Sequence, residues 1–218
     1  MSLRIFLADD HEVVRLGLRT LLEKDTGWKV VGEASNGRDA VEQVRDLKPD
    51  VVVMDLTMPQ LNGLEATRQI LRDAPRTAVM ILSVNESEDI VHEVLSAGAR
   101  GFMLKSDAGK DLLVAVEGLH QGRPFFSARV ADYVLQHYHK RGTGAPEPIV
   151  TPSSTLTARE REVLQLLVEG QSNKEVAASL GIGVKTAEAH RANLMKKLGV
   201  HSMSELVRYA IRNKIVEP

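Results

Sequence analysis

Two kinds of hydrophobic pattern divide this chain of 218 residues. In the first part, short apolar runs alternate with stretches whose apolar residues recur every three or four positions, which predicts strands alternating with amphipathic helices. Runs such as Val51–Met54 and Val79–Leu82 are apolar throughout, as in strands covered on both faces. Alternation of this kind predicts a parallel sheet with right-handed crossovers. The expected strands are Arg4–Ala8, Lys29–Ala34, Val51–Asp55, Ala78–Ser83 and Gly101–Leu104, and the expected helices span 12–24, 37–47, 64–73, 87–97 and 109–120.

In the second part, every segment has a helical pattern. Three helix starts have the Ser/Thr-x-x-Glu spacing of a capping box: Thr157 with Glu160, Ser172 with Glu175 and Ser202 with Glu205. Gly181 and Gly183 precede a third helix expected over Val184–Leu198, and a last helix is expected over Ser204–Asn213. The pattern predicts a small all-α domain of four helices.

A linker separates the two patterns. Arg141–Thr155 contains three prolines and two glycines and has no helical or strand period. A further helical pattern, Ala128–His139, leads into it. We therefore expect a first domain over 1–125, a helix and linker over 126–155, and a second domain over 156–218. Proline keeps such a tether partly extended without fixing the angle between the domains.

Composition and charge narrow the class of protein. With 43% hydrophobic and 26% charged residues, the chain is typical of soluble globular proteins. It has neither a signal-peptide pattern nor the roughly 20 apolar residues of a membrane span, so we expect a cytoplasmic protein with no membrane partner. Zero cysteines exclude disulfides, thiol catalysis and thiolate zinc sites. Residues 1–142 carry a net charge of −3 and 143–218 a net charge of +2, which favours a polyanion partner for the second part.

Five polar residues lie at one predicted edge of the sheet. Asp9 and Asp10 follow the first strand, Asp55 and Ser83 end the third and fourth, and Lys105 follows the fifth. Parallel strands bring their carboxyl ends together, and open α/β sheets bind ligands there. Clustered carboxylates without cysteine or paired histidine suit Mg²⁺. Asp55 is then the best-placed nucleophile for an aspartyl phosphate, with Lys105 and the Ser83 hydroxyl beside the phosphoryl group.

Residues 3–121 resemble the receiver domain of two-component response regulators. The motifs that carry the resemblance are Asp9-Asp10, Asp55-Leu56-Thr57-Met58-Pro59, Asn62-Gly63, Ser83 and Gly101-Phe102-Met103-Leu104-Lys105. The resemblance implies a flavodoxin-like fold, an α/β domain with a five-stranded parallel sheet of order 2-1-3-4-5.

The resemblance also implies roles for these residues. Asp55 would accept a phosphoryl group from a sensor histidine kinase, and Lys105 would contact that group. Ser83 and Phe102 would form the conformational switch. The Mg²⁺ site would comprise Asp9, Asp10, Asp55 and the backbone carbonyl of Thr57. The kinase would contact the first helix near Val14, Leu18 and Leu21 or their exposed neighbours.

Leu156–Ile215 resembles the LuxR-type helix-turn-helix of the NarL/FixJ family. The carrying motifs are Leu156-Thr157-Ala158-Arg159-Glu160, Asn173-Lys174-Glu175-Val176-Ala177, Leu180-Gly181-Ile182, Val184-Lys185-Thr186, His190-Arg191-Ala192-Asn193-Leu194 and Lys197-Leu198-Gly199-Val200. The resemblance implies a third helix that enters the major groove of double-stranded DNA and a last helix that supplies a dimer contact.

Helical spacing groups residues on one face of the third helix, and the resemblance implies that this face enters the major groove. Lys185, Glu188, Ala189 and Ala192 share one face. Lysine can contact guanine, glutamate can accept a hydrogen bond from cytosine, and alanine can contact the methyl group of thymine. The basic residues nearby are expected at phosphates. Leu194 and Leu198 are expected in the core. The full set of expected DNA contacts is Lys185, Thr186, Glu188, Ala189, Arg191, Ala192, Lys196 and Lys197. Glu188 stands where relatives often carry a basic residue, so no known operator is transferred.

These features predict a DNA-binding response regulator that uses Mg²⁺ and is not an enzyme. Phosphorylation of Asp55 is expected to switch homodimerisation and DNA binding, and the unphosphorylated receiver either packs near the third helix or keeps the protein monomeric. Two alternatives stay open. One is a phosphatase or phosphotransferase with an aspartyl-phosphate intermediate, although such enzymes often carry an acid where this chain has Thr57. The other is a DNA-binding protein whose receiver serves only for interaction.

Overall fold

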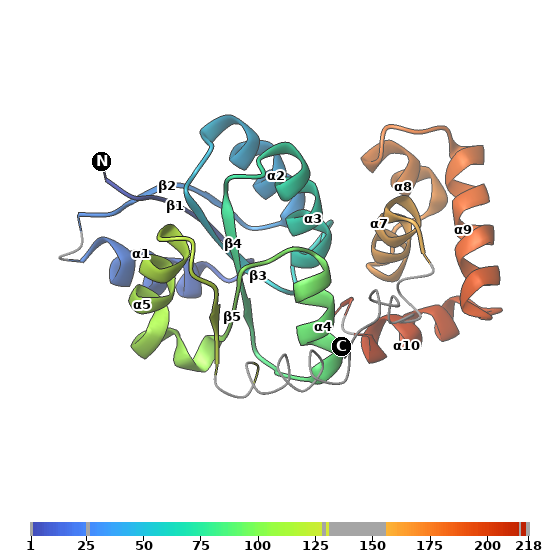
Figure 1. Ribbon diagram of the computed structural model, residues 1–218. Helices are drawn as coiled ribbons and strands as arrows, with labels where there is room; N and C mark the ends of the chain where they lie inside the picture. Colours follow the sequence, from blue (N-terminus) through green and yellow to red (C-terminus); the bar gives the residue numbers. More distant parts are fainter. Residues whose placement is uncertain (1, 25–26, 128–129, 131–155, 214, 217–218) are drawn as a thin grey trace, which may run out of the picture.

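The computed structural model describes residues 2–24, 27–127, 130, 156–213 and 215–216 and contains an α/β domain followed by a helical domain (Figure 1). The expected helix over Ala128–His139 and the linker over Arg141–Thr155 lie almost entirely outside these residues. No helix within the described ranges has the length and apolar character needed to cross a membrane.

The first domain contains one parallel sheet, and its five main strands have the predicted bounds. They are β1 (Arg4–Ala8), β2 (Lys29–Ala34), β3 (Val51–Asp55), β4 (Ala78–Ser83) and β5 (Gly101–Leu104). The strand order is β2-β1-β3-β4-β5-β6, so the predicted 2-1-3-4-5 order is confirmed and extended by one strand. The added strand, β6 (Phe125–Phe126), pairs with Gly101 and Phe102 of β5. Two residues are too few for a sequence period to reveal.

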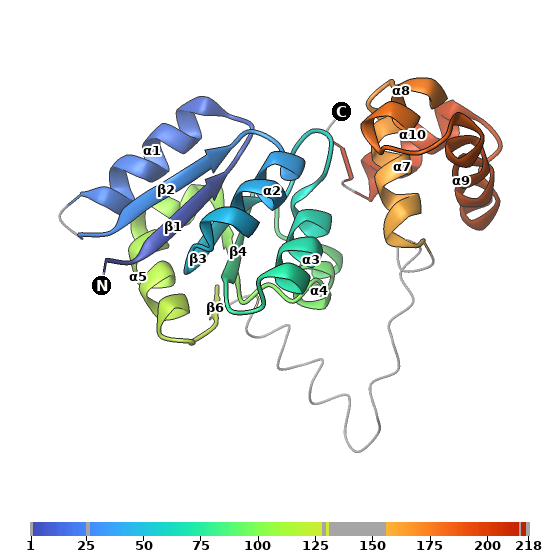
Figure 2. The ribbon, with the colours of Figure 1, turned by 90° about the horizontal axis from the view of Figure 1, so that it is seen from above.

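Five helices cover the two faces of the sheet (Figure 2). Helices α1 and α5 lie on one face and α2, α3 and α4 on the other. Successive side chains of a strand point to opposite faces of the sheet, so each strand contributes to both hydrophobic cores. In β1, Ile5 and Leu7 pack beneath α1 and α5, whereas Phe6 and Ala8 face the opposite core. The helices are α1 (Glu12–Glu23), α2 (Gly37–Leu47), α3 (Gly63–Asp73), α4 (Glu88–Ser96) and α5 (Ala108–His120), preceded by a 3₁₀ turn at Lys105–Asp107.

The second domain has the four predicted helices, which are α7 (Ala158–Val168), α8 (Asn173–Ser179), α9 (Val184–Leu198) and α10 (Met203–Arg212). Two of the three predicted capping boxes are complete, at α7 and α8. At α10, Ser202 caps the Glu205 amide, but the Glu205 carboxylate accepts from the His201 amide instead of closing the box. Leu194 is fully buried as predicted, while Leu198 packs only partly into the core.

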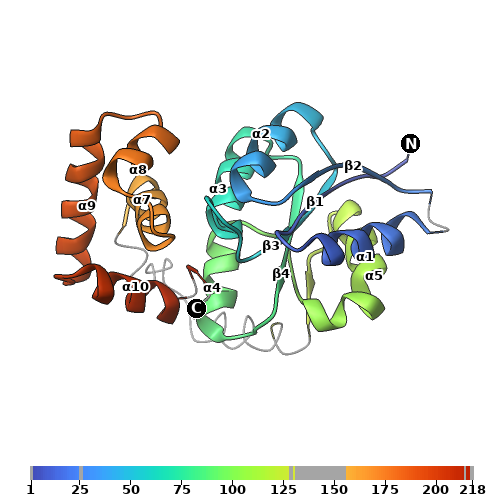
Figure 3. The same ribbon diagram turned by 180° about the vertical axis from the view of Figure 1, so that it is seen from behind.

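The two domains meet through α7, which lies beside α3. Helix α9 lies on the side of its domain that is remote from the receiver (Figures 1 and 3). The receiver therefore does not cover α9 in this arrangement, contrary to one of the two expectations for the unphosphorylated protein.

Candidate functional site

Three carboxylates meet where β1 and β3 end, as the sequence predicted. β1 ends at Ala8 and delivers Asp9 and Asp10, and Asp55 is the last residue of β3. Oxygen atoms of these three side chains and a nitrogen of His11 all lie within 4.8 Å of one another. Asp9 and Asp55 are 1% and 4% exposed. Two buried acids and one more accessible acid thus share a small volume.

Lys105 compensates part of this negative charge. Its Nζ atom lies 2.8 Å from Asp9 Oδ2 and 3.0 Å from Asp55 Oδ2. Burial alone would lower the pKa of Lys105, but the hydrogen bonds and charges of Asp9 and Asp55 outweigh it and raise that pKa. Lys105 therefore stays protonated between the two carboxylates, where its ammonium group can also contact an added anion.

The pKa of Asp55 is strongly perturbed. Burial and the neighbouring charge of Asp9 raise the pKa of Asp55 to about 7, despite the opposing effect of Lys105. Lys105 therefore does not offset the combined effect of burial and the Asp9 charge on Asp55. A site with this imbalance favours a bound cation, and a strongly perturbed carboxyl group beside clustered charges is typical of a functional centre.

The loop between β3 and α3, residues 56–62, closes tightly over the end of β3. Gly63 donates its amide proton to the Leu56 carbonyl at 2.8 Å. A Cβ atom on Gly63 would lie 2.0 Å from the Asp55 carbonyl oxygen, so only glycine fits there. Gln60 has a φ of 65°, the left-handed region that non-glycine residues rarely adopt. This loop contains Thr57, the expected source of a carbonyl ligand.

The remaining predicted receiver residues have defined neighbours. The Ser83 hydroxyl donates to the Asn85 carbonyl at 2.6 Å and accepts from the Asn85 amide at 3.1 Å. Phe102 is 1% exposed and lies in the core between the sheet and α2, α3 and α4. His11 is the residue before α1, and its Nδ1 atom lies 2.7 Å from Asp10 Oδ1. Ser83 is the last residue of β4, and β4 pairs with β3, the strand that ends at Asp55.

Helix α9 presents most of the predicted DNA-contact residues to solvent. Lys185, Thr186, Glu188, Ala189, Ala192, Lys196 and Lys197 are exposed, and Arg191 is half-buried. The residues predicted to face the bases therefore form one accessible stripe. Lys197 differs from the others because its Nζ atom lies 2.7 Å from the Glu160 carboxylate. Burial alone would raise the pKa of Glu160, but hydrogen bonds from Lys197 and Thr157 hold that pKa below its usual value.

Comparison with known proteins agrees with both halves of this geometry. Residues 5–117 match the response regulator receiver domain family, and residues 154–210 match the bacterial regulatory proteins of the luxR family. The transcriptional regulatory protein LiaR of Bacillus subtilis (strain 168) is 37% identical over 214 residues, which are 98% of this chain and 99% of LiaR. The chain belongs to the NarL/FixJ family of two-component response regulators.

Other members of the family are similar over nearly the whole chain. The oxygen regulatory protein NreC of Staphylococcus aureus (strain JH9) is 36% identical over 216 residues, 99% of this regulator and 100% of NreC. RcsB of Salmonella enterica serovar Typhimurium, solved on a promoter in the presence of the phosphomimetic BeF₃⁻, matches with a TM-score of 0.60 at 28% identity, covering 96% of this regulator and 98% of RcsB. As a member of this family, the regulator controls transcription in response to phosphorylation and is not an enzyme.

Sequence reasoning missed the residues that join the two domains of the regulator. Gln165 is 1% exposed and bonds the backbone of the β3–α3 loop, and Arg161 pairs with Glu65 of α3. Arg161 and Gln165 of α7 and its C-cap residue Glu169 follow one another at intervals of four residues and form a polar stripe. Such a stripe normally faces solvent, so the sequence holds no signal that separates an interface from a solvated face.

Proposed function

We propose that Asp55 accepts the phosphoryl group of a sensor histidine kinase and that the phosphorylated regulator dimerises and binds DNA through α9. A carboxylate oxygen of Asp55 forms the new P–O bond as the P–N bond to the kinase imidazole breaks, and the imidazole keeps the electron pair. The observation that carries this proposal is the pair of contacts from Lys105 to Asp9 and Asp55. They set an ammonium group beside the acceptor, where negative charge accumulates during transfer.

The donor set of the acidic cluster fits Mg²⁺. Asp10 and Asp55, with the Thr57 backbone carbonyl, would hold the ion, and Asp9 would support them from its buried position. When bound, Mg²⁺ neutralises charge on the phosphoryl oxygens. The raised pKa of Asp55 supports this assignment because burial and the charge of Asp9 disfavour the ionised carboxyl group, and a bound cation would favour it. Lys105 orients the acceptor carboxylate, and Ser83, which follows the β4 partner of Asp55 in the sheet, would contact the new phosphoryl group.

The kinase would approach the face of α1 that is not packed on the sheet. Leu18 is buried, and Val14 and Leu21 pack partly into the core, so these three residues serve folding. Their neighbours Val13 and Leu16 are 82% and 65% exposed. Exposed aliphatic side chains beside an active site are a natural contact for a partner helix. We therefore assign the kinase contact to Val13 and Leu16.

The exposed stripe of α9 supports the DNA-binding half of the proposal. Lys185, Glu188, Ala189 and Ala192 would read base edges, and Thr186, Arg191 and Lys196 would position the helix on phosphates. Two half-sites roughly one helical turn of DNA apart would favour a dimer. RcsB, the relative solved on a promoter, supports DNA as the partner. A regulator of chromosomal transcription works in the cytoplasm.

The test is the intact mass of the protein with and without Mg²⁺ and acetyl phosphate. Wild type should gain about 80 Da, one phosphoryl group, only when both are present. Asp55→Asn should gain nothing, while Asp50→Asn, at the residue just before β3, should behave as wild type. A wild-type protein that gains no mass and also fails to bind beryllofluoride would contradict the proposal and favour a receiver used only for interaction.

A further inference from the structure

Gln165 of α7 holds the β3–α3 loop by its backbone. Its amide nitrogen donates to the Met58 carbonyl at 2.8 Å, and its amide oxygen accepts from the Asn62 amide at 2.7 Å. The side chain is 1% exposed, so both bonds form away from water. A buried amide that satisfies a donor and an acceptor of one loop fixes the separation between them, because losing either bond leaves a buried polar group unpaired.

Glu169, one turn further along at the C-cap of α7, holds the middle of the same loop. Its two carboxylate oxygens lie 3.0 and 3.2 Å from the backbone nitrogen of Gln60, the residue with the left-handed conformation. Gln165 also donates to Glu169 at 2.8 Å, which joins the two side chains into one unit. The interface continues along α3, where Arg161 pairs with Glu65 and Gln69 donates to Glu162.

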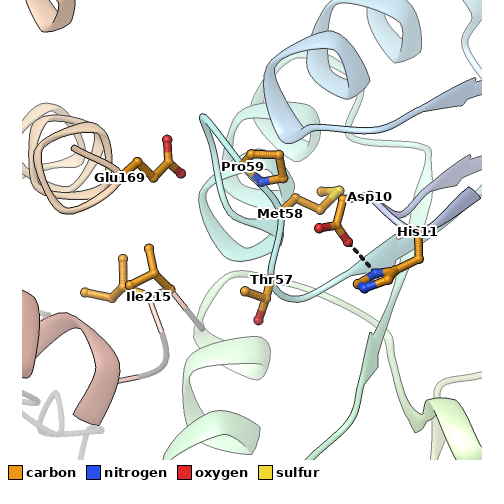
Figure 4. Close-up of a pocket in the computed structure, with 8 residues that line it drawn as sticks. Asp10, His11, Thr57, Met58, Pro59, Glu169 and Ile215 are labelled. Carbon is orange, nitrogen blue, oxygen red and sulfur yellow. Dashed lines mark ion pairs between the residues drawn. The ribbon is translucent and has the colours of Figure 1, made fainter. Parts of the chain in front are cut away.

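The clamped loop borders the phosphoryl-acceptor site. A cavity of about 210 Å³ separates the domains there. Its receiver wall includes Asp10, Thr57 and Met58, and its opposite wall includes Glu169 and Ile215 (Figure 4). An anionic phosphoryl donor approaching from this side meets the carboxylate of Glu169 in addition to the acidic cluster. Docking of the DNA-binding domain therefore places a negative charge on the path of the phosphoryl donor and fixes the loop that contains Thr57.

Resting on the function proposed above, we propose that Gln165 and Glu169 are positioning residues that clamp the β3–α3 loop in a conformation resisting phosphorylation of Asp55. Docking of the DNA-binding domain and phosphorylation then oppose one another. Because coupling between two equilibria is reciprocal, docking disfavours the phosphorylated state by the same free energy by which phosphorylation disfavours docking. The rate of phosphoryl transfer is a separate quantity, which the clamp lowers by fixing the loop that contains Thr57. The clamp acts on phosphoryl transfer and leaves the exposed DNA-reading stripe of α9 uncovered.

The first test compares the rates at which full-length variants are phosphorylated by acetyl phosphate and Mg²⁺, followed by intact mass. A small donor is used so that a difference in rate reflects the site and not kinase docking. Gln165→Ala should react about tenfold faster than wild type, within the usual range of coupling between sites. Glu169→Gln keeps an acceptor for the Gln60 amide but loses the charge, and it should react at an intermediate rate. Gln171→Ala, on the same domain but away from the loop, is the matched control and should react as wild type.

The second test locks the docked state. The chain has no cysteine, so Gln69→Cys with Glu162→Cys, which replaces two residues in contact across the interface, can be joined by a short reducible bifunctional thiol reagent. The joined protein should react about tenfold more slowly than the same protein after reduction. Joining residues on α3 and α7 touches neither Asp55 nor its acidic neighbours, so a merely structural effect would persist after reduction.

The outcomes separate this inference from the proposed function. Equal rates for wild type, Gln165→Ala and Gln171→Ala would overturn the clamp while leaving Asp55 as the acceptor. A joined protein that reacts as fast as the reduced one would overturn it as well. If no variant gains mass at Asp55 and none binds beryllofluoride, the acceptor function fails and the clamp fails with it.

Discussion

The two chemical regions of this regulator are built in opposite ways. The phosphoryl-acceptor site collects Asp9, Asp55 and Lys105 from three strands, buries the two acids and leaves each group dependent on the others. The proposed DNA face lies on one helix of 15 residues, and most of its side chains are exposed to solvent. In the first region a charge is stabilised by a few nearby partners. In the second, exposed charges such as Lys185 and Lys196 are hydrated and would meet their partners only on binding, while Lys197 pairs with Glu160 of its own domain.

This difference predicts how the two regions respond to substitution. Interactions between buried charges are strong and non-additive, because removing one leaves the others uncompensated in a poorly solvated place. Exposed charges that meet phosphates contribute small and nearly independent amounts. Single substitutions should therefore be severe at the sheet edge and graded along α9. The following experiments test that contrast from the largest expected effect to the smallest.

The largest effect is expected for Lys105→Ala. The substitution removes the ammonium group within 3.0 Å of both buried carboxylates, so charge developing on the phosphoryl group loses its fixed partner. We expect phosphorylation by acetyl phosphate to slow by about 10²–10³-fold, as for other preorganised charge-stabilising donors. Lys110→Ala on the exposed side of α5 is the control and should keep the wild-type rate. A Lys105→Ala rate within threefold of wild type would mean that the buried site is no more cooperative than the exposed helix.

A smaller but distinctive effect is expected for the pH dependence of stability in EDTA. The pKa of Asp55 in the folded protein, about 7, lies above its ordinary value of 3.8, so the folded state binds this proton more tightly than the unfolded state. The free energy of unfolding of wild type should fall as pH rises from about 4 to about 7 and then level off, while Asp55→Asn lacks this contribution.

Above neutral pH, Asp55→Asn should therefore unfold at a higher temperature than wild type. The rise in the pKa of Asp55 from 3.8 to about 7 corresponds to at most about 4 kcal/mol of unfolding free energy. Because the substitution also removes one partner of Lys105, we expect a gain in unfolding free energy of about 2 kcal/mol. Thermal unfolding at about pH 5 and about pH 8 measures it, and the gain should shrink at the lower pH. The exposed Asp46→Asn should show no such difference. A gain for Asp55→Asn that is equal at both pH values would contradict the raised pKa.

Much of this arrangement was predictable from sequence because local signals specify it. The five main strands follow from apolar runs, and α7 and α8 follow from Thr157 with Glu160 and Ser172 with Glu175. The carboxyl-edge site follows from topology, since parallel strands bring Asp9, Asp55 and Lys105 together regardless of loop detail. These predictions depend on periods, spacing and chain direction.

The domain interface was not predictable, and the reason is physical. Gln165 is buried only because another domain packs on it, and its partners are backbone atoms of Met58 and Asn62, which any residue type would supply. A pairing that uses backbone groups leaves no complementary residue type in the sequence. β6 was not predicted because two residues are too short to have a recognisable period. The pairing of Lys197 with Glu160 was not predicted because a basic residue near the end of a basic helix resembles a phosphate contact.

Base readout on α9 should give the next smaller effect. Lys185→Ala removes an exposed ammonium group from the stripe that we propose faces base edges, and a specific contact to guanine contributes about 1–3 kcal/mol of discrimination. We expect weaker binding to the cognate site with little change in binding to unrelated DNA. Fluorescence anisotropy at matched salt concentrations measures both. Lys174→Ala, outside α9, is the control. Equal losses on cognate and unrelated DNA would assign Lys185 to phosphate contact instead.

The smallest effects come from two adjacent lysines whose roles the structure separates. Lys197 bonds the Glu160 carboxylate, which is 4% exposed and also caps α7, whereas Lys196 is exposed. Lys197→Ala should lower the free energy of unfolding of the DNA-binding domain by about 1 kcal/mol, because Glu160 loses a charged donor. Lys196→Ala should leave stability unchanged and instead reduce the salt dependence of DNA binding by about one phosphate contact.

The pair provides the sharpest comparison along α9, since the two substitutions are identical and one residue apart. Chemical denaturation measures the first effect, and the slope of log affinity against log salt concentration measures the second. If Lys197→Ala changed the salt slope and left stability intact, the Glu160 contact would contribute nothing and Lys197 would belong with the phosphate contacts. If Lys197→Ala alone lowers stability, the basic end of α9 serves two purposes at once: Lys196 meets the DNA backbone, while Lys197 anchors α9 to the first helix of its own domain.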